Sequence, residues 1–206
     1  MYHLKIFTFL VLTLSLLSCE NFLFDKDTKE GNGTIIEMPF DYTGFTKVET
    51  GWACESTISY ADTFSIRIWI DQNLASDLEV HKSMNTLEIE LDERYNYRNF
   101  TFEAEITLPH VQEVELSGAS MSTVTGFDED QDVDLDCSGA SRILGSLNSQ
   151  DLNVELSGAS RLNLAGSGGD LEISASGAST VDLETFSAVN ADIELSGASM
   201  ATINIS

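Results

Sequence analysis

The chain contains the tetrapeptide Ser-Gly-Ala-Ser five times, beginning at Ser117, Ser138, Ser157, Ser176 and Ser196, at intervals of 21, 19, 19 and 20 residues. A period of about 20 residues is typical of proteins built from stacked supersecondary units, each of which buries its apolar face only against its neighbours. The recurrence constrains the fold because it fixes where the chain turns.

Apolar and polar residues alternate on both sides of each tetrapeptide. Val114 and Leu116 flank Glu115 before the first copy, and Leu162 and Leu164 flank Asn163 after the third. A period of two is typical of a half-buried β-strand. We therefore predict that each repeat forms a strand, a tight corner and a second strand. The residues predicted to point outward just before the corners are Glu115, Asp136, Glu155, Ser174 and Glu194.

Glycine follows the first serine of every corner, at Gly118, Gly139, Gly158, Gly177 and Gly197. Glycine adopts tight-turn backbone conformations without a steric cost, so these five residues are predicted structural corners. Near-identical copies argue against catalysis, because a catalytic serine is needed only once. The sequence predicts an all-β, parallel β-helix-like solenoid; an antiparallel sandwich explains the constant spacing less well.

Residues 35–110 lack the tetrapeptide but alternate in the same way, most strictly in Phe64–Ile70 and Leu87–Leu91. We predict that they form earlier, less regular coils of the same solenoid and cap one end of it. The sequence stops inside a predicted strand, at Ile205 and Ser206, with no capping segment. Either the last edge pairs with another copy in a homo-oligomer, or an element that the sequence does not reveal covers it.

Residues 1–18 have one basic residue, Lys5, followed by an apolar stretch from Ile6 to Leu17, and are predicted to be a signal peptide. Leu16-Leu17-Ser18-Cys19 resembles the lipobox of bacterial lipoproteins, which predicts lipidation of Cys19; ordinary signal-peptidase cleavage is the alternative. Residues 19–34 are predicted to be the lipidated cysteine and a flexible tether, and 35–206 one solenoid domain with regular repeats from 111.

The formal net charge is −24, which excludes nucleic acid as a partner. Acidic residues concentrate at one predicted outer face, and stacking would place Asp136 between Glu115 and Glu155. The carboxylates that could share a Ca²⁺ ion there are Glu115, Asp130, Asp132, Asp134, Asp136 and Glu155. The alternative is a solvated acidic face that keeps the protein soluble. No other cofactor is predicted.

The sequence resembles the auto-transporter adhesin, head GIN domain family, found largely in secreted or lipid-anchored Bacteroidetes proteins. The resemblance rests on the segments 44–48, 85–89 and 106–109, on residues 111–116 and on the repeated corners. It implies a right-handed β-helix-like fold and a surface role, and it supplies no catalytic residue.

Two functional classes follow. The first is a non-enzymatic cell-surface lipoprotein, exported and anchored at the outer membrane or cell surface, that acts as an adhesin or scaffold and binds a glycan or a protein. The second is a carbohydrate-active β-helix enzyme resembling a polysaccharide lyase. Such a lyase needs basic residues against an acidic substrate, and the repeats offer only Arg142 and Arg161 in a strongly negative region. No catalytic residue is predicted.

Overall fold

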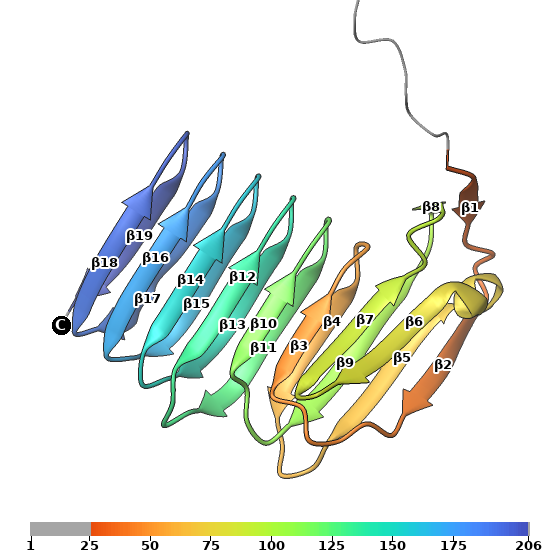
Figure 1. Cartoon of the computed structure of the whole chain (residues 1–206), viewed down its shortest axis with the longest axis horizontal. Coiled ribbons are helices and arrows are strands. Elements are labelled where there is room, and N and C mark those ends of the chain that lie inside the picture. Colours follow the sequence, from red (N-terminus) through yellow and green to blue (C-terminus); the bar gives the residue numbers. More distant parts are fainter. Residues whose placement is uncertain (1–25, 206) are drawn as a thin grey trace, which may run out of the picture.

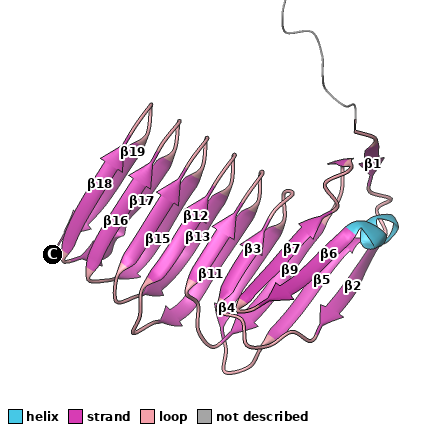
Figure 2. Cartoon of the chain, viewed as in Figure 1, coloured by secondary structure: helices cyan, strands magenta, loops and turns pink. Residues whose placement is uncertain are grey.

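A computed structural model describes residues 26–205, and the predicted all-β class is confirmed. Two large open sheets lie face to face and run the length of the molecule (Figures 1 and 2). A 3₁₀ helix, η1 (Gln72–Asp77), and a two-stranded sheet of β1 (Thr28–Glu30) and β8 (Asn96–Arg98) lie at one end.

The eight-stranded sheet contains, in spatial order, β18 (Asn190–Leu195), β16 (Asp170–Ala175), β14 (Leu152–Leu156), β12 (Val133–Cys137), β10 (Glu113–Leu116), β3 (Lys47–Thr50), β7 (Thr86–Leu91) and β6 (Leu78–Ser83). The nine-stranded sheet contains β19 (Met200–Ile205), β17 (Thr180–Ala188), β15 (Arg161–Ser167), β13 (Arg142–Asn148), β11 (Met121–Asp128), β4 (Glu55–Tyr60), β9 (Phe102–Leu108), β5 (Ser65–Asp71) and β2 (Ile35–Phe40).

From β10 onward the chain alternates between the two sheets, so that one strand of each sheet and the corner between them form a coil. Each coil pairs in parallel with the next, as β10 does with β12 and β11 with β13. Inward residues of both sheets, such as Val114 and Ile143, are fully buried and form one continuous core. The period-two alternation produces this arrangement because every second side chain faces the opposite sheet.

The Ser-Gly-Ala-Ser segments are the turns that join the two strands of each coil, as predicted. Their glycines have φ between 70° and 77°. An ideal Cβ on Gly158 would lie 2.4 Å from the carbonyl oxygen of Gly139 in the coil below. The last serine of each of the first four corners is buried, and the hydroxyl of Ser160 donates to the carbonyl of Ser157 at 2.7 Å. Glycine is therefore required for its conformation and for the close stacking of corners.

The N-terminal half departs from a simple sequential stack. The coil of β3 and β4 lies between β10–β11 and β7–β9, so spatial order and chain order differ. Strands β2, β5 and β6 pair antiparallel with their neighbours. The sequence predicts less regular coils in residues 35–110 but not this order, because alternation identifies strands without choosing their neighbours.

The predicted tether is partly folded. Residues 28–30 form β1 and pair with β8, and Lys29 forms an ion pair with Asp77 at 2.6 Å. The folded domain therefore begins before residue 35. The predicted signal peptide and Cys19 lie outside the described residues. Within 26–205, no helix has the length and apolar character needed to cross a membrane.

Candidate functional site: an acidic groove

The predicted outward acids stand in register on the eight-stranded sheet. Glu115 is paired with Asp136, Asp136 with Glu155, Glu155 with Ser174, and Ser174 with Glu194. The row continues in the other direction, where Glu115 is paired with Glu49 and Glu49 with Glu88. We call these residues the acid column: Glu88, Glu49, Glu115, Asp136, Glu155, Ser174 and Glu194.

Glu49 and Glu88 were not predicted to belong to this row. A signal for Glu49 was present, because Gly51-Trp52-Ala53-Cys54 occupies the place of a Ser-Gly-Ala-Ser corner. Thr50 pairs with Leu116, the residue just before the first corner, and Glu49 precedes Gly51 as Glu115 precedes Ser117. Only the alanine is shared with Ser-Gly-Ala-Ser at the same position, so the tetrapeptide alone does not identify this corner.

Crowding of like charges changes the acidity of the column. Burial raises the pKa of Asp136, and the neighbouring carboxylates, of which Glu155 has the largest effect, raise it further, to about 6. The pKa of Glu49 is also raised, first by burial and then by Glu115 and Glu88. Within residues 26–205, no carboxylate of the column forms an ion pair. The column therefore holds unneutralised negative charge.

A second row of polar side chains beside the column is partly neutralised. Lys47 forms an ion pair with Glu113, which raises the pKa of the lysine. The amide of Asn153 donates to Asp134 at 2.8 Å. These partners break the run of like charges in the second row, so the unpaired charge of this face lies mainly on the acid column.

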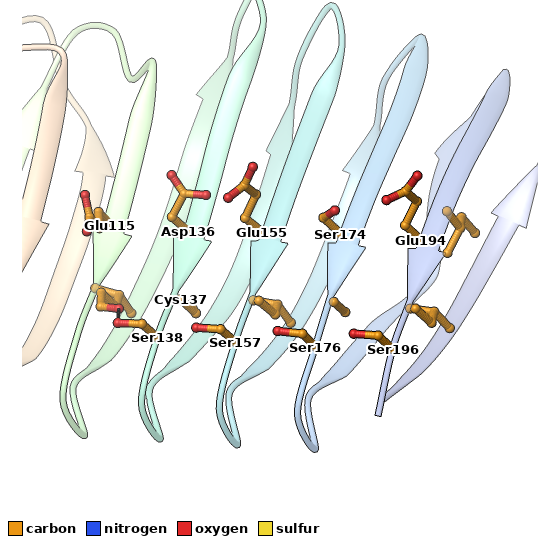
Figure 3. A pocket seen from close by; sticks show the side chains of 15 residues that line it. Glu115, Asp136, Cys137, Ser138, Glu155, Ser157, Ser174, Ser176, Glu194 and Ser196 are labelled. Atoms are coloured by element: carbon orange, nitrogen blue, oxygen red, sulfur yellow. Dashed lines mark hydrogen bonds between the residues drawn. The ribbon is translucent and has the colours of Figure 1, made fainter. Parts of the chain in front are cut away.

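A groove of about 840 Å³ runs along this face across successive coils (Figure 3). Its walls are the acid column from Glu115 to Glu194 and the first serines of the corners, Ser138, Ser157, Ser176 and Ser196. We call it the acid-serine groove. Carboxylates accept hydrogen bonds and hydroxyls donate or accept them, repeated at the strand spacing of about 4.8 Å. The groove thus suits an extended ligand with repeated donor groups.

The six acids predicted to share calcium do not all lie on one strand face. Strand β12 begins at Val133, so Asp134 and Asp136 lie in it while Asp130 and Asp132 are exposed before it. A bend at residues 130 and 131 separates β11 from β12, and just before it the carboxylate of the buried Glu129 accepts a hydrogen bond from the amide of Val111 at 2.9 Å. Among residues 26–205, no group of three or more His, Cys, Asp or Glu side chains is arranged to hold a metal ion. Calcium binding stays a prediction.

An aromatic cluster lies beyond the serine corners, at the replaced corner. Trp52 takes the place of the corner glycine with φ of 58°, and its ring meets Tyr97 edge-on at 6.0 Å between centroids. The chain's own cations cover these rings: Lys29 Nζ lies 3.6 Å from the centroid of Tyr95 and Lys26 Nζ lies 5.5 Å from that of Trp52. The cluster therefore fastens β1 to the domain.

Of the histidines and free cysteines in residues 26–205, Cys137 alone lines the groove, and its thiol is buried. His81 and His110 are exposed and neither lines the groove. Cys54 and Cys137 are free, buried thiols, and burial raises the pKa of Cys137 to about 12. Arg142 and Arg161 stand in register with each other on the nine-stranded sheet, away from the groove.

Solved structures share this architecture. A structure titled "putative adhesin" from Parabacteroides merdae has a TM-score of 0.64 at 18% identity, covering 86% of this chain and 84% of that one. One with the same description from Bacteroides fragilis has a TM-score of 0.67 at 18% identity, covering 86% and 100%. A "putative lipid binding protein" from Parabacteroides distasonis has a TM-score of 0.63 at 13% identity, covering 87% and 100%. At these identities the likeness shows a common fold.

No curated protein matches the sequence. A family model does match it, over residues 44–206, which is most of the chain and includes every strand of the acid-serine groove. The chain belongs to the family described as "Putative auto-transporter adhesin, head GIN domain".

Proposed function

We propose that this protein is a non-enzymatic binding module displayed at the cell surface, and that the acid-serine groove holds its ligand. The observation that carries this proposal is the unpaired acid column facing a parallel row of serines across several coils. The stack of coils acts as a right-handed β-solenoid, a rigid support whose repeat sets the spacing of the ligand contacts. Family membership supports a surface role.

The chemistry of the groove favours a ligand rich in hydroxyl or ammonium groups, such as a neutral or amino-sugar glycan. Negative charge repels polyanions, so acidic polysaccharides are disfavoured. A lyase of the polysaccharide type would need basic groups beside the bound sugar, whereas Arg142 and Arg161 belong to the other sheet. The geometry therefore favours binding over cleavage.

Binding can be tested with the domain from residue 20 onward on an array of neutral, amino-substituted and acidic glycans. We expect retention of neutral or amino-substituted chains, with no shortened product in the eluate. The double variant Asp136→Asn, Glu155→Gln should weaken binding, whereas Glu184→Gln, on an exposed position of the nine-stranded sheet, should not. Equal binding by both variants would contradict the placement of the site.

We further propose that the mature chain is exported and anchored through lipid on Cys19. Two or three acyl chains hold a protein stably at a membrane, whereas one chain does so only weakly. Mass spectrometry of the protein purified from membranes should find an acylated Cys19 at its N-terminus. An unmodified N-terminus released into the medium would contradict the anchor.

A further inference from the structure

The coil formed by β18 and β19 has one neighbour within the described residues. Strand β18 pairs with β16 alone and β19 with β17 alone, so the outer edges of both strands are open. Large apolar side chains are exposed there: Leu195 is 45%, Met200 63% and Ile205 47% exposed. Ile193 and Ile203 pack on the core from one side only. The end of the hydrophobic core and two strand edges thus face water together.

The opposite end of the molecule carries the features that usually protect strand edges. Edge strand β2 contains Pro39, which has no N–H to donate, and edge strand β6 contains Glu79, His81 and Lys82. Strand β19, with the sequence Met-Ala-Thr-Ile-Asn-Ile, contains neither proline nor a charged residue. Charges and proline keep exposed edges from pairing. By this criterion the β19 edge is available for pairing, whereas β18 carries Asp192 and Glu194 and is suited to pairing with an uncharged edge.

We propose that the open coil of β18 and β19 binds the same coil of a second copy, tip to tip. A partner must supply two strand edges on either side of an apolar surface, and a single extended peptide covers only one edge. A second open coil of this fold supplies all three features. A two-fold contact of this kind uses the same surface on both molecules and closes at a dimer. A contact with the protected opposite end would instead extend into a fibre.

Charge selects between two ways of making this dimer. Strands β18 and β19 run in opposite directions, because a four-residue corner joins them. A two-fold axis parallel to the strands places β18 against β19 of the second copy, antiparallel, at both edges. Asp192 and Glu194 then face the uncharged outward side of β19. The other axis would set the two β18 strands, and their acids, against each other, which is unfavourable.

This contact places the β1 strands of the two copies far apart. The chain enters the domain at β1, at the end of the molecule opposite β18 and β19 (Figure 1). A tip-to-tip dimer therefore places the two β1 strands at its two far ends, an arrangement that suits anchoring in opposite membranes. The self-association stands on the open coil alone; its use in joining two cells rests on the proposed surface anchoring.

Sedimentation of the domain from residue 20 onward over a range of concentrations tests the association. We expect a monomer–dimer equilibrium without larger species. The variant Ile203→Lys puts a charge into the open apolar surface, where the ammonium still reaches water in a monomer, and should abolish the dimer. The matched control is Ile36→Lys, at a partly buried position of the opposite end, which should leave the dimer unchanged.

Hydrogen exchange of the unmodified protein gives a readout that does not depend on the variants. Amides of residues 190–205 should become protected as the concentration rises, while those of 35–40 should not. A monomer at every concentration, or a dimer lost in Ile36→Lys but kept in Ile203→Lys, would overturn the proposal. Beads that carry the domain through its N-terminus should clump without added glycan, which separates self-association from the ligand binding proposed for the groove.

Discussion

The backbone amide of Ala159 donates a hydrogen bond of 2.7 Å to the carbonyl oxygen of Gly139 in the preceding coil. The same bond recurs between Ala178 and Gly158, so successive corners are tied directly to each other. Nothing larger than a hydrogen atom fits on the glycine beside this bond. Corner stacking, rather than surface chemistry, therefore explains why the tetrapeptide recurs so closely.

Two single substitutions of these glycines by alanine separate the cost of the left-handed backbone conformation from the cost of a clash between stacked corners. Gly118→Ala should lower the free energy of unfolding by roughly 1–2 kcal/mol, the cost of a left-handed conformation for a residue with a Cβ. No further loss is expected, since the added Cβ would meet nothing closer than the Trp52 nitrogen at 3.4 Å. Gly158→Ala should lose more, because its Cβ would lie 2.4 Å from the Gly139 oxygen. Urea unfolding measures both, and equal losses would contradict the stacking role.

The acid column should make folding stability depend on pH. The pKa of Asp136 is about 6 in the folded protein and near 3.8 in the unfolded chain, so the folded state binds this proton more tightly. The contribution of Asp136 to the free energy of unfolding is thus most favourable in acid, and it is lost as the pH rises from 3.8 to about 6. Asp136→Asn should stabilise the domain by roughly 0.5–1 kcal/mol at neutral pH, since solvent screens the charges.

Thermal unfolding at several pH values checks this expectation. The advantage of Asp136→Asn should vanish as the pH falls below 3.8, where Asp136 is protonated in both states. Asp41→Asn, at an exposed position away from the column, serves as the control and should change little. A variant less stable than the unmodified protein at neutral pH would contradict the repulsion.

Calcium should act on the same charges. If the predicted ion binds between Asp136 and its neighbours, titration with Ca²⁺ raises the melting temperature of the unmodified protein more than that of Asp136→Asn. Calorimetry measures the accompanying heat. No heat and no change in melting temperature would remove the calcium prediction and leave a solvated acidic face.

The two free thiols should be unreactive in the folded domain. Burial raises the pKa of Cys54 and of Cys137, so little thiolate is present at neutral pH. Incubation with an alkylating reagent followed by mass spectrometry should find no label on the native domain from residue 20 onward and both cysteines labelled in urea. Rapid labelling of the native protein would contradict their burial.

Strand β1 should contribute to stability although it lies in the predicted tether. The carboxylate of Asp77 is nearly buried and is held by Lys29 at 2.6 Å. A domain that begins at residue 35 leaves this carboxylate without its lysine, and should be less stable than one that begins at residue 26 by about 1–3 kcal/mol. Lys29→Met in the longer domain isolates the ion pair. Equal stability of the two domains would show that β1 is dispensable.

The alternation of apolar and polar residues and the recurring tetrapeptide determine, from sequence alone, which side chains face the core and where the chain turns. Successive side chains face opposite sides of a strand, so the sequence predicts that Val114 and Leu116 lie in the core and Glu115 at the surface, and Val114 and Leu116 are fully buried. The corner glycines followed from their spacing. These features are local, since each depends on a few neighbouring residues and on the geometry of a single strand.

Tertiary structure alone decided which strands are neighbours. The coil of β3 and β4 inserts beside β10 and β11, which extends the acid column to Glu49 and Glu88 and makes Trp52 the end of the row of corners. The tertiary structure also pairs residues 28–30 with β8 and leaves the outer edges of β18 and β19 unpaired within the described residues. Strand pairing is set by long-range packing, because every strand edge offers the same backbone donors and acceptors; the sequence determined the faces of the strands, and the folded structure their partners.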